Sequence, residues 1–314
     1  MKSLLVSAAA LALTACATAG NRDLDDYDAS RAISVDAPRS AAATVESTNP
    51  ALWQVRDEDT TLYLLGTFAY LPETYEWRTP AIDAAIAASD TLVLETLIDR
   101  SDQASAGRLM ADLGLARDLP PLLNRVDPAL RPTLSNLMAR SGVETATYDI
   151  MENWAAAFTL YSAHMQLLGL SGAAGVAPDL RAAFSGKRLD QLETNRQQLE
   201  AYDALPIEAQ RQLLESVILG PDAIKTRFTD MLAAWSSGDL DAIDATFNMG
   251  IAPGTALHAA LVTQRNRRLA DLVRARLATP GTQMVAVNAG ALVGPSGVLA
   301  ALEAAGLTVS RVAS

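Results

Sequence analysis

The sequence predicts an α/β fold in which a central mixed β-sheet is built from strand-helix units at the N- and C-terminal ends, with a largely helical middle region. Short β-prone segments alternate with helical segments both near residue 60 and near residue 290. The stretch from about 101 to 237 instead carries apolar residues at helical spacing. Because strands and helices of this kind bury their apolar faces against one another, both ends are expected to share one sheet.

The N-terminal unit is predicted to begin with a β-hairpin. The runs 52–56 and 61–65 are rich in β-prone residues and flank a polar turn. A helix is expected over 79–89, because Pro80 is favourable in a first helical turn. The mostly apolar run 91–96 then has the composition of a short buried strand.

In the middle region, a helix that begins near residue 153 is predicted to bury one stripe of large side chains. The stripe consists of Trp154, Phe158, Tyr161, Met165 and Leu168. Their three- and four-residue spacing is typical of core packing, and an aromatic box that binds a cofactor is the alternative.

The C-terminal unit repeats the strand-helix pattern. Helices are predicted over about 256–277 and 296–305, and strands over 283–287 and 307–312. Gly306 stands where a glycine commonly ends a helix.

Residues 1–15 are predicted to be a secretory signal peptide. Lys2 precedes an apolar run that is shorter than the roughly 20 residues needed to span a bilayer. The segment Leu13-Thr14-Ala15-Cys16 matches a bacterial lipobox, which predicts that Cys16 is lipidated and anchors the chain to a membrane. A signal peptide that merely contains a cysteine is the alternative.

The lipobox leads us to expect a protein of the bacterial cell envelope that is anchored by lipid, faces the periplasm and resides in the outer membrane. Residues 16–49 are rich in small and polar residues, and they are predicted to be a flexible tether. Residues 50–314 are expected to form the folded domain.

The composition limits the partners of this domain. The chain has 36 acidic and 25 basic residues and a formal net charge of −11, so repulsion from phosphates argues against nucleic acid as a partner. Cys16 is the only cysteine, and the chain therefore forms no internal disulfide.

Two short segments follow predicted strands and carry the main functional signal. The first is Gly66-Thr67-Phe68-Ala69 and the second is Asn288-Ala289-Gly290-Ala291. Together they resemble the TraB/GumN family, which is related to the Tiki metallopeptidases and has two Gly-x-x-His motifs in these contexts. The resemblance covers about residues 50–313. In this chain Ala69 and Ala291 stand where the family has histidines.

The resemblance implies a divalent metal that is held by the two motifs together with an acidic residue and that activates water. A methyl group has no lone pair to offer a metal, so no cofactor is expected here. Glu95 matches the acidic position of the family, and both a relict catalytic acid and a structural ion pair remain open for it. Ala177 is a further departure, because family members commonly carry an acidic residue after the segment that matches Gly175-Val176.

The segment 264–267 resembles another family motif and contains Arg265 and Asn266. On an ideal helix of 100° per residue, His258 and Arg265 both fall within the apolar stripe. We expect Arg265 to pair with a carboxylate on the sheet, namely Glu95. For His258, a hydrogen-bonded core residue and a substitute metal ligand are the two interpretations.

Two other classes of site fit the sequence poorly. The loop 287–294 follows a strand and precedes a helix, but it lacks the Gly-x-Gly-x-x-Gly spacing of a dinucleotide site. Ser296 lies in Gly-Pro-Ser-Gly rather than in the Gly-x-Ser-x-Gly motif of a serine hydrolase.

The leading expectation is therefore a pseudoenzyme without its metal site that binds or scaffolds an unknown protein or peptide. The alternative is a divergent hydrolase that acts on peptide or cell-envelope material through Glu95 and Asn288, with or without a metal that is bound by ligands other than these histidines.

Overall fold

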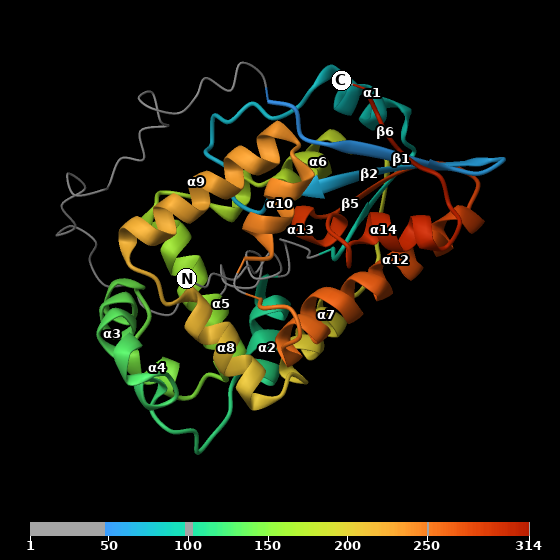
Figure 1. The fold of residues 1–314 in the computed structure, drawn as a ribbon. Coiled ribbons are helices and arrows are strands. Elements are labelled where there is room, and N and C mark those ends of the chain that lie inside the picture. The colour runs from blue at the N-terminus through green and yellow to red at the C-terminus, as the bar shows by residue number, and fades with distance from the viewer. Residues whose placement is uncertain (1–47, 98–102, 250, 314) are drawn as a thin grey trace.

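A mixed sheet of six strands occupies one part of the molecule, and helices make up the other (Figure 1). The computed structural model describes residues 48–97, 103–249 and 251–313. The predicted signal peptide, Cys16 and nearly all of the predicted tether lie outside these ranges. The strands are β1 (Leu52–Arg56), β2 (Thr60–Thr67), β3 (Thr91–Leu94), β4 (Arg188–Gln191), β5 (Gly281–Asn288) and β6 (Val309–Arg311). The helices are α1 (Pro80–Ala88), α2 (Gln103–Gly114), α3 (Arg131–Arg140), α4 (Thr145–Asp149), α5 (Asn153–Leu167), α6 (Val176–Ala183), α7 (Asn195–Asp203), α8 (Ile207–Val217), α9 (Pro221–Ser237), α10 (Leu240–Phe247), α11 (Ala256–His258), α12 (Arg265–Ala275), α13 (Ala289–Leu292) and α14 (Val298–Ala304).

The sheet has the strand order β4-β3-β5-β2-β1-β6. The first four strands run parallel to one another, whereas β1 is antiparallel to both β2 and β6. The predicted α/β fold with a mixed sheet from both ends of the chain is confirmed. Strand β4 was not predicted, because its sequence Arg-Leu-Asp-Gln has one apolar residue and lies within the helical middle region.

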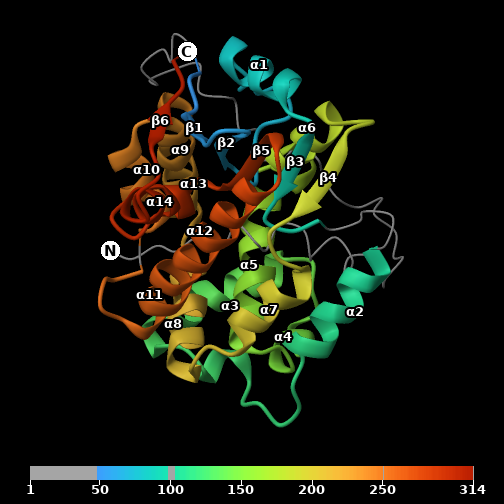
Figure 2. The same ribbon diagram turned by 90° about the vertical axis from the view of Figure 1, so that its right-hand side faces the viewer.

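The register of the parallel strands brings their carboxyl ends to one edge of the sheet. Thr67 pairs with Asn288 between β2 and β5, and Leu94 pairs with both Ala286 and Gln191. Figure 2 shows that this edge faces the half of the molecule that contains α2, α5, α7 and α8. In open α/β sheets, this is the edge at which ligand sites form.

The N-terminal helix α1 begins as its sequence predicts. Pro80 occupies the first turn, and the side chain of Thr79 accepts a hydrogen bond from the N–H of Ile82 at 3.2 Å. At the opposite end of the chain, Gly306 has a φ of +84° and its N–H donates to the carbonyl of Glu303, which closes α14.

Helix α5 departs from the single stripe that its spacing predicts. All of its residues from Asn153 to Met165 are buried, because α5 lies at the centre of the helical half and packs against α8, α3 and α2. The ring of Phe158 lies edge-on to those of Trp154 and Tyr202, with centroids 5.5 and 4.7 Å away. These aromatic residues therefore pack into the core.

The predicted helix over 256–277 is interrupted by a π-helix, Ala259–Gln264, between α11 and α12. The placement of His258 in the core was wrong, since His258 is half-buried and its Nδ1 lies 3.4 Å from the hydroxyl of Thr263. The prediction assumed an uninterrupted α-helix, whereas a π-helix has more residues per turn and shifts the register. Arg265 and Asn266, which follow the π-helix, are buried as expected.

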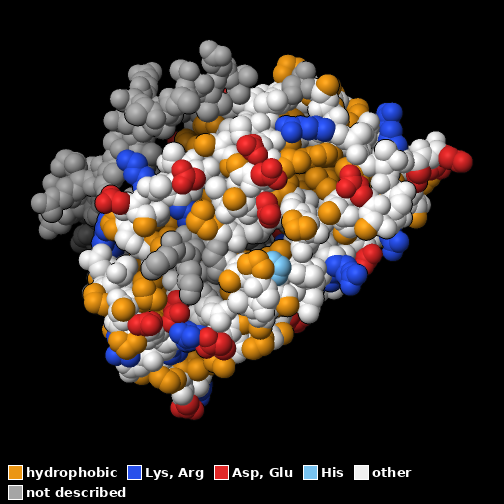
Figure 3. Space-filling model, viewed as in Figure 1, with side chains coloured by type: hydrophobic (Ala, Val, Ile, Leu, Met, Phe, Trp, Pro, Cys, Tyr) orange, Lys and Arg blue, Asp and Glu red, His pale blue; other side chains and the backbone are white. Residues whose placement is uncertain are grey.

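Acidic and basic side chains are interspersed with small hydrophobic groups on the face shown in Figure 3. Within the described part of the chain, the helices are too short or too polar for any of them to cross a bilayer.

Candidate functional site at the carboxyl ends of the parallel strands

Glu95 directly follows β3, and its side chain is 13 % exposed. Its Oε2 accepts hydrogen bonds from Nη2 of Arg265 at 2.8 Å and from Nε2 of Gln198 at 3.3 Å. Its Oε1 accepts the backbone N–H of Asn288 at 2.7 Å. The predicted pairing of Glu95 with Arg265 is confirmed, and both carboxylate oxygens have donors, as a buried charge requires.

Glu193 supplies a second carboxylate at the same edge, and its side chain is 3 % exposed. It accepts hydrogen bonds from Arg268 at 2.9 Å and from Gln198 at 3.4 Å, and it lies 3.6 Å from Nη2 of Arg265. Its own N–H donates to the carbonyl oxygen of Glu95 at 2.9 Å. Two acids and two arginines therefore form one network, in which the amide of Gln198 bonds to both acids.

Sequence analysis missed the contribution of Glu193 and Gln198. The signal that marks Glu193 is its position two residues after β4, close to that of Glu95, which directly follows β3. This position could not be recognised from the sequence, because β4 is too polar to be predicted as a strand.

The two loops that carry the resemblance lie side by side, because β2 and β5 are neighbouring parallel strands. A Cβ added at Gly66 would lie 3.0 Å from both Cα and Cβ of Ala289, so a side chain there would press on the second loop. The indole Nε1 of Trp235 donates to the carbonyl oxygen of Gly66 at 2.8 Å. The first loop is thereby fixed against both β5 and α9, with Thr67 as its last strand residue.

The second loop is held by its own short helix. The side chain of Asn288 caps α13 by accepting the N–H of Gly290 at 3.0 Å, and Asn248 donates to the carbonyl of Gly290 at 3.1 Å. A Cβ at Gly290 would lie 2.7 Å from Cβ of Phe247. Gly290 therefore allows α10 to pack closely on the loop.

The segment Gly175-Val176 packs directly on the first loop. The N–H of Val176 donates to the carbonyl oxygen of Phe68 at 3.0 Å, and a Cβ at Gly175 would overlap the carbonyl oxygen of Ala69. Ala177 follows this contact and is half-buried against the core. Ala69 and Ala177, two of the three positions at which the sequence predicts a departure from the family pattern, thus flank one contact.

The third position, Ala291, lines a small cavity of about 40 Å³ beside the network. Arg265, Asn266, Asn288 and Gly290 also line this cavity, whereas His258 does not. Nε of Arg265 is buried without a hydrogen-bond partner in the described part of the chain. Arg265 thus lines the cavity and also has one buried N–H donor without a partner in the described part of the chain.

Electrostatics fix the protonation of two of these groups. Burial lowers the pKa of Arg265, but the neighbouring Glu95, Tyr202 and Glu193 outweigh it, so the pKa lies above its usual value. Burial, aided by Glu95 and Glu193, raises the pKa of Tyr202. At neutral pH the site therefore contains a charged arginine and a neutral tyrosine.

The donor set does not fit a divalent metal. Within residues 48–97, 103–249 and 251–313, no three His, Cys, Asp or Glu side chains come together in a metal-binding arrangement. The carboxylates of Glu95 and Glu193 instead accept hydrogen bonds from Arg265 and Arg268, whose guanidinium groups supply the positive charge. Ala69 and Ala291, the positions at which the sequence predicts a loss of the family's histidines, offer no lone pair to a metal.

Comparison with known proteins gives one match, to the sequence model of a family. The sequence model of the TraB/PrgY/gumN family matches residues 51–311, a range that contains both loops, Glu95, Glu193 and Arg265. Neither the curated proteins nor the solved structures gave a match to the chain. Since the family match covers most of the sequence, the chain belongs to the TraB/PrgY/gumN family.

Proposed function

We propose that this chain is a lipid-anchored protein of the bacterial cell envelope whose TraB/GumN-type domain has lost its metal site and binds or scaffolds a protein or peptide. The observation that carries the proposal is the set of hydrogen bonds that the carboxylate of Glu95 accepts. Its two oxygens are bound to Arg265, Gln198 and the backbone of Asn288. The neighbouring loops carry Ala69 and Ala291, which offer no ligand to a metal.

Metal-assisted hydrolysis requires an ion that lowers the pKa of bound water, and the ion requires ligands with lone pairs. Here the cation beside Glu95 is a guanidinium group, which cannot bind water as a Lewis acid. In this proposal, the site has lost the ligands for metal chemistry, and the loops and the network around Glu95 that remain serve to bind a partner.

The lipobox supports the place of action. Lipidation of Cys16 would hold the domain at the membrane, and we propose that it faces the periplasm from the outer membrane. The net charge of −11 agrees with a protein or peptide ligand rather than a nucleic acid.

A metal titration tests the proposal. The parent chain and the variant Ala69→His/Ala291→His are titrated with zinc and with manganese in a calorimeter. The parent should bind neither metal stoichiometrically, and the variant should gain binding, because two imidazoles return to loops that β2 and β5 hold side by side.

The matched control is Ala87→His/Ala304→His, which adds two histidines at exposed positions on α1 and α14. Binding by this control equal to that of the loop variant would show that the loops form no site. Stoichiometric binding by the parent would contradict the loss of the metal site.

A divergent hydrolase is the second candidate, and Nε of Arg265, which is buried without a hydrogen-bond partner in the described part of the chain, favours it. A buried donor of this kind could hold a substrate oxygen near Glu95. Turnover of a fluorogenic peptide by the parent, lost in Glu95→Gln, would replace the binding proposal with this one.

A further inference from the structure

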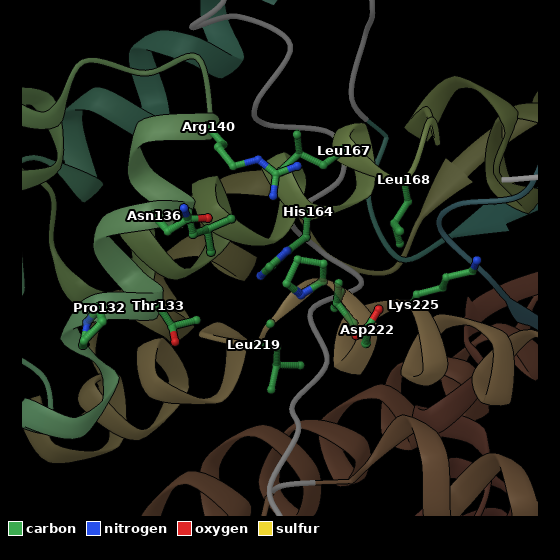
Figure 4. A pocket seen from close by; sticks show the side chains of 14 residues that line it. Pro132, Thr133, Asn136, Arg140, His164, Leu167, Leu168, Leu219, Asp222 and Lys225 are labelled. Atoms are coloured by element: carbon green, nitrogen blue, oxygen red, sulfur yellow. The ribbon is translucent and has the colours of Figure 1, made fainter. Parts of the chain in front are cut away.

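A second cavity, of about 420 Å³, opens between α3, α5 and the N-terminal end of α9 (Figure 4). It shares no lining residue with the cavity beside Arg265. Much of its wall is apolar, and the apolar side chains include Leu137, Leu168, Leu219 and Ile224. The cavity is large enough for a small molecule with an aliphatic part.

The charged residues of this cavity are mostly cations. Arg140 and Lys225 stand on opposite sides of His164 (Figure 4), and Asp222 is the one acidic residue in the lining. Neither cation forms an ion pair in the described part of the chain. The lining of this cavity therefore has more basic than acidic residues, whereas the whole chain has a net charge of −11.

A third cation lies nearby. Arg227, on the inner face of α9, is 5 % exposed, and none of its three guanidinium nitrogens has a hydrogen-bond partner in the described part of the chain. Burial is the main cause that lowers the pKa of His164 to about 4, and the charges of Arg227 and Arg140 lower it further. The positive charges of both guanidinium groups thus favour a neutral ring at His164, which lines the cavity.

The helix dipole adds to this positive potential. Helix α9 has 17 residues, and its first residues Pro221 and Asp222 line the cavity together with the preceding Gly220. The N-terminal end of a helix carries partial positive charge and favours anions. Arg140, Lys225 and this helix end thus line one cavity that has an apolar wall.

We infer that this cavity binds an amphipathic anion, in which a carboxylate or phosphate group is joined to an aliphatic chain. Arg140, whose guanidinium group points toward His164 in Figure 4, would hold the anionic group, and Lys225 would add positive potential from the opposite side. The aliphatic chain would pack against Leu137, Leu168 and Ile224.

Calorimetric titration of the full chain with sodium octanoate tests the inference. Acetate carries the charge alone and octan-1-ol carries the aliphatic chain alone, so each should bind at least about tenfold more weakly than octanoate. Octyl phosphate is titrated in parallel, and the tighter of the two amphipathic anions identifies the head group. Equal binding of octan-1-ol and octanoate would overturn the inference, because the cations would then play no part.

Charge-matched variants locate the site. Arg140→Gln/Lys225→Gln should weaken octanoate binding by about tenfold or more. The control Arg196→Gln/Arg274→Gln removes the same charge from exposed positions on α7 and α12 and should bind like the parent. Octanoate binding that is unchanged in the first variant, or equally weakened in both, would contradict a site between α3 and α9.

Discussion

The backbone N–H of Asn288 donates to Oε1 of Glu95 at 2.7 Å, so the acid after β3 is bonded directly to the loop after β5. This hydrogen bond joins positions that are 193 residues apart in the chain. Because Arg265 holds the other oxygen of the same carboxylate, α12 and both strands meet at Glu95. The network thus contributes to the structure of the domain whether or not it keeps any chemistry.

Removing the cation from this network should destabilise the fold. Arg265→Met leaves the carboxylates of Glu95 and Glu193 with less compensation in a buried site, and the expected loss is about 3 to 5 kcal/mol of the free energy of unfolding. Urea denaturation measures it. The control is Arg267→Met, an exposed position on the same helix, which should change stability little. Equal stability of the two variants would show that Glu95 does not depend on Arg265.

The contact between Gly175 and the first loop can be tested with a matched glycine. Gly175 and Gly220 are both helix N-caps with extended backbone, at φ −75° and −71°. Alanine at Gly175 would overlap the carbonyl of Ala69, whereas a Cβ at Gly220 meets nothing within 4 Å. Thermal unfolding should therefore show a clearly lower midpoint for Gly175→Ala than for Gly220→Ala. Similar midpoints would mean that the loop moves aside without cost.

Stability should fall in acid partly because of His164. Burial lowers its pKa in the folded protein to about 4, compared with 6.5 for the free side chain. The unfolded chain therefore binds a proton that the folded chain rejects, and the stability present above pH 6.5 is lost as the pH falls toward 4. Between pH 7 and pH 5 the loss should be about 2 kcal/mol.

The control variant is His164→Gln, because glutamine can still donate a hydrogen bond to the carbonyl of Val217 but does not titrate. Urea denaturation at the two pH values gives the difference between parent and variant. A variant that loses as much stability in acid as the parent would assign the pH dependence to other groups.

Lipidation can be tested at Cys16. Because acyl chains give stable anchoring, the parent expressed in a bacterial host should partition into the detergent phase of a Triton X-114 extraction. Cys16→Ser should move the chain to the aqueous phase, and Ala17→Ser, next to it, should not. Parent protein in the aqueous phase would favour a signal peptide that merely contains a cysteine.

The elements that the sequence predicts well are those with local signals. Thr79 and Pro80 mark the start of α1, and the alternation of strand and helix at both ends of the chain predicts the mixed sheet. Strand β4 was not predicted because it forms by pairing with β3, and the paired residues are 97 positions apart in the sequence. The full burial of α5 was not predicted for a similar reason, because it depends on contacts with helices from several other parts of the chain.

The part of the candidate site that could be predicted from the sequence is the ion pair, because a buried arginine requires a hydrogen-bond acceptor. An inward arginine on α12 requires an acceptor, and that requirement predicts the pair of Arg265 with Glu95. His258 was misplaced because hydrophobic spacing does not reveal a π-helix. Glu193 and Gln198 were missed, since their roles depend on a strand pairing that local sequence does not encode.

The order of the strands also limits how another protein can approach the domain. The two edges of the sheet are β4, with four residues, and β6, with three. Charged side chains mark both edges, namely Arg188 and Asp190 on β4 and Arg311 on β6. Short and charged edges are poor templates for the addition of a foreign strand. A protein ligand of this domain would therefore engage its loops and helices, and the sheet itself is protected from growing by recruitment of strands from other chains.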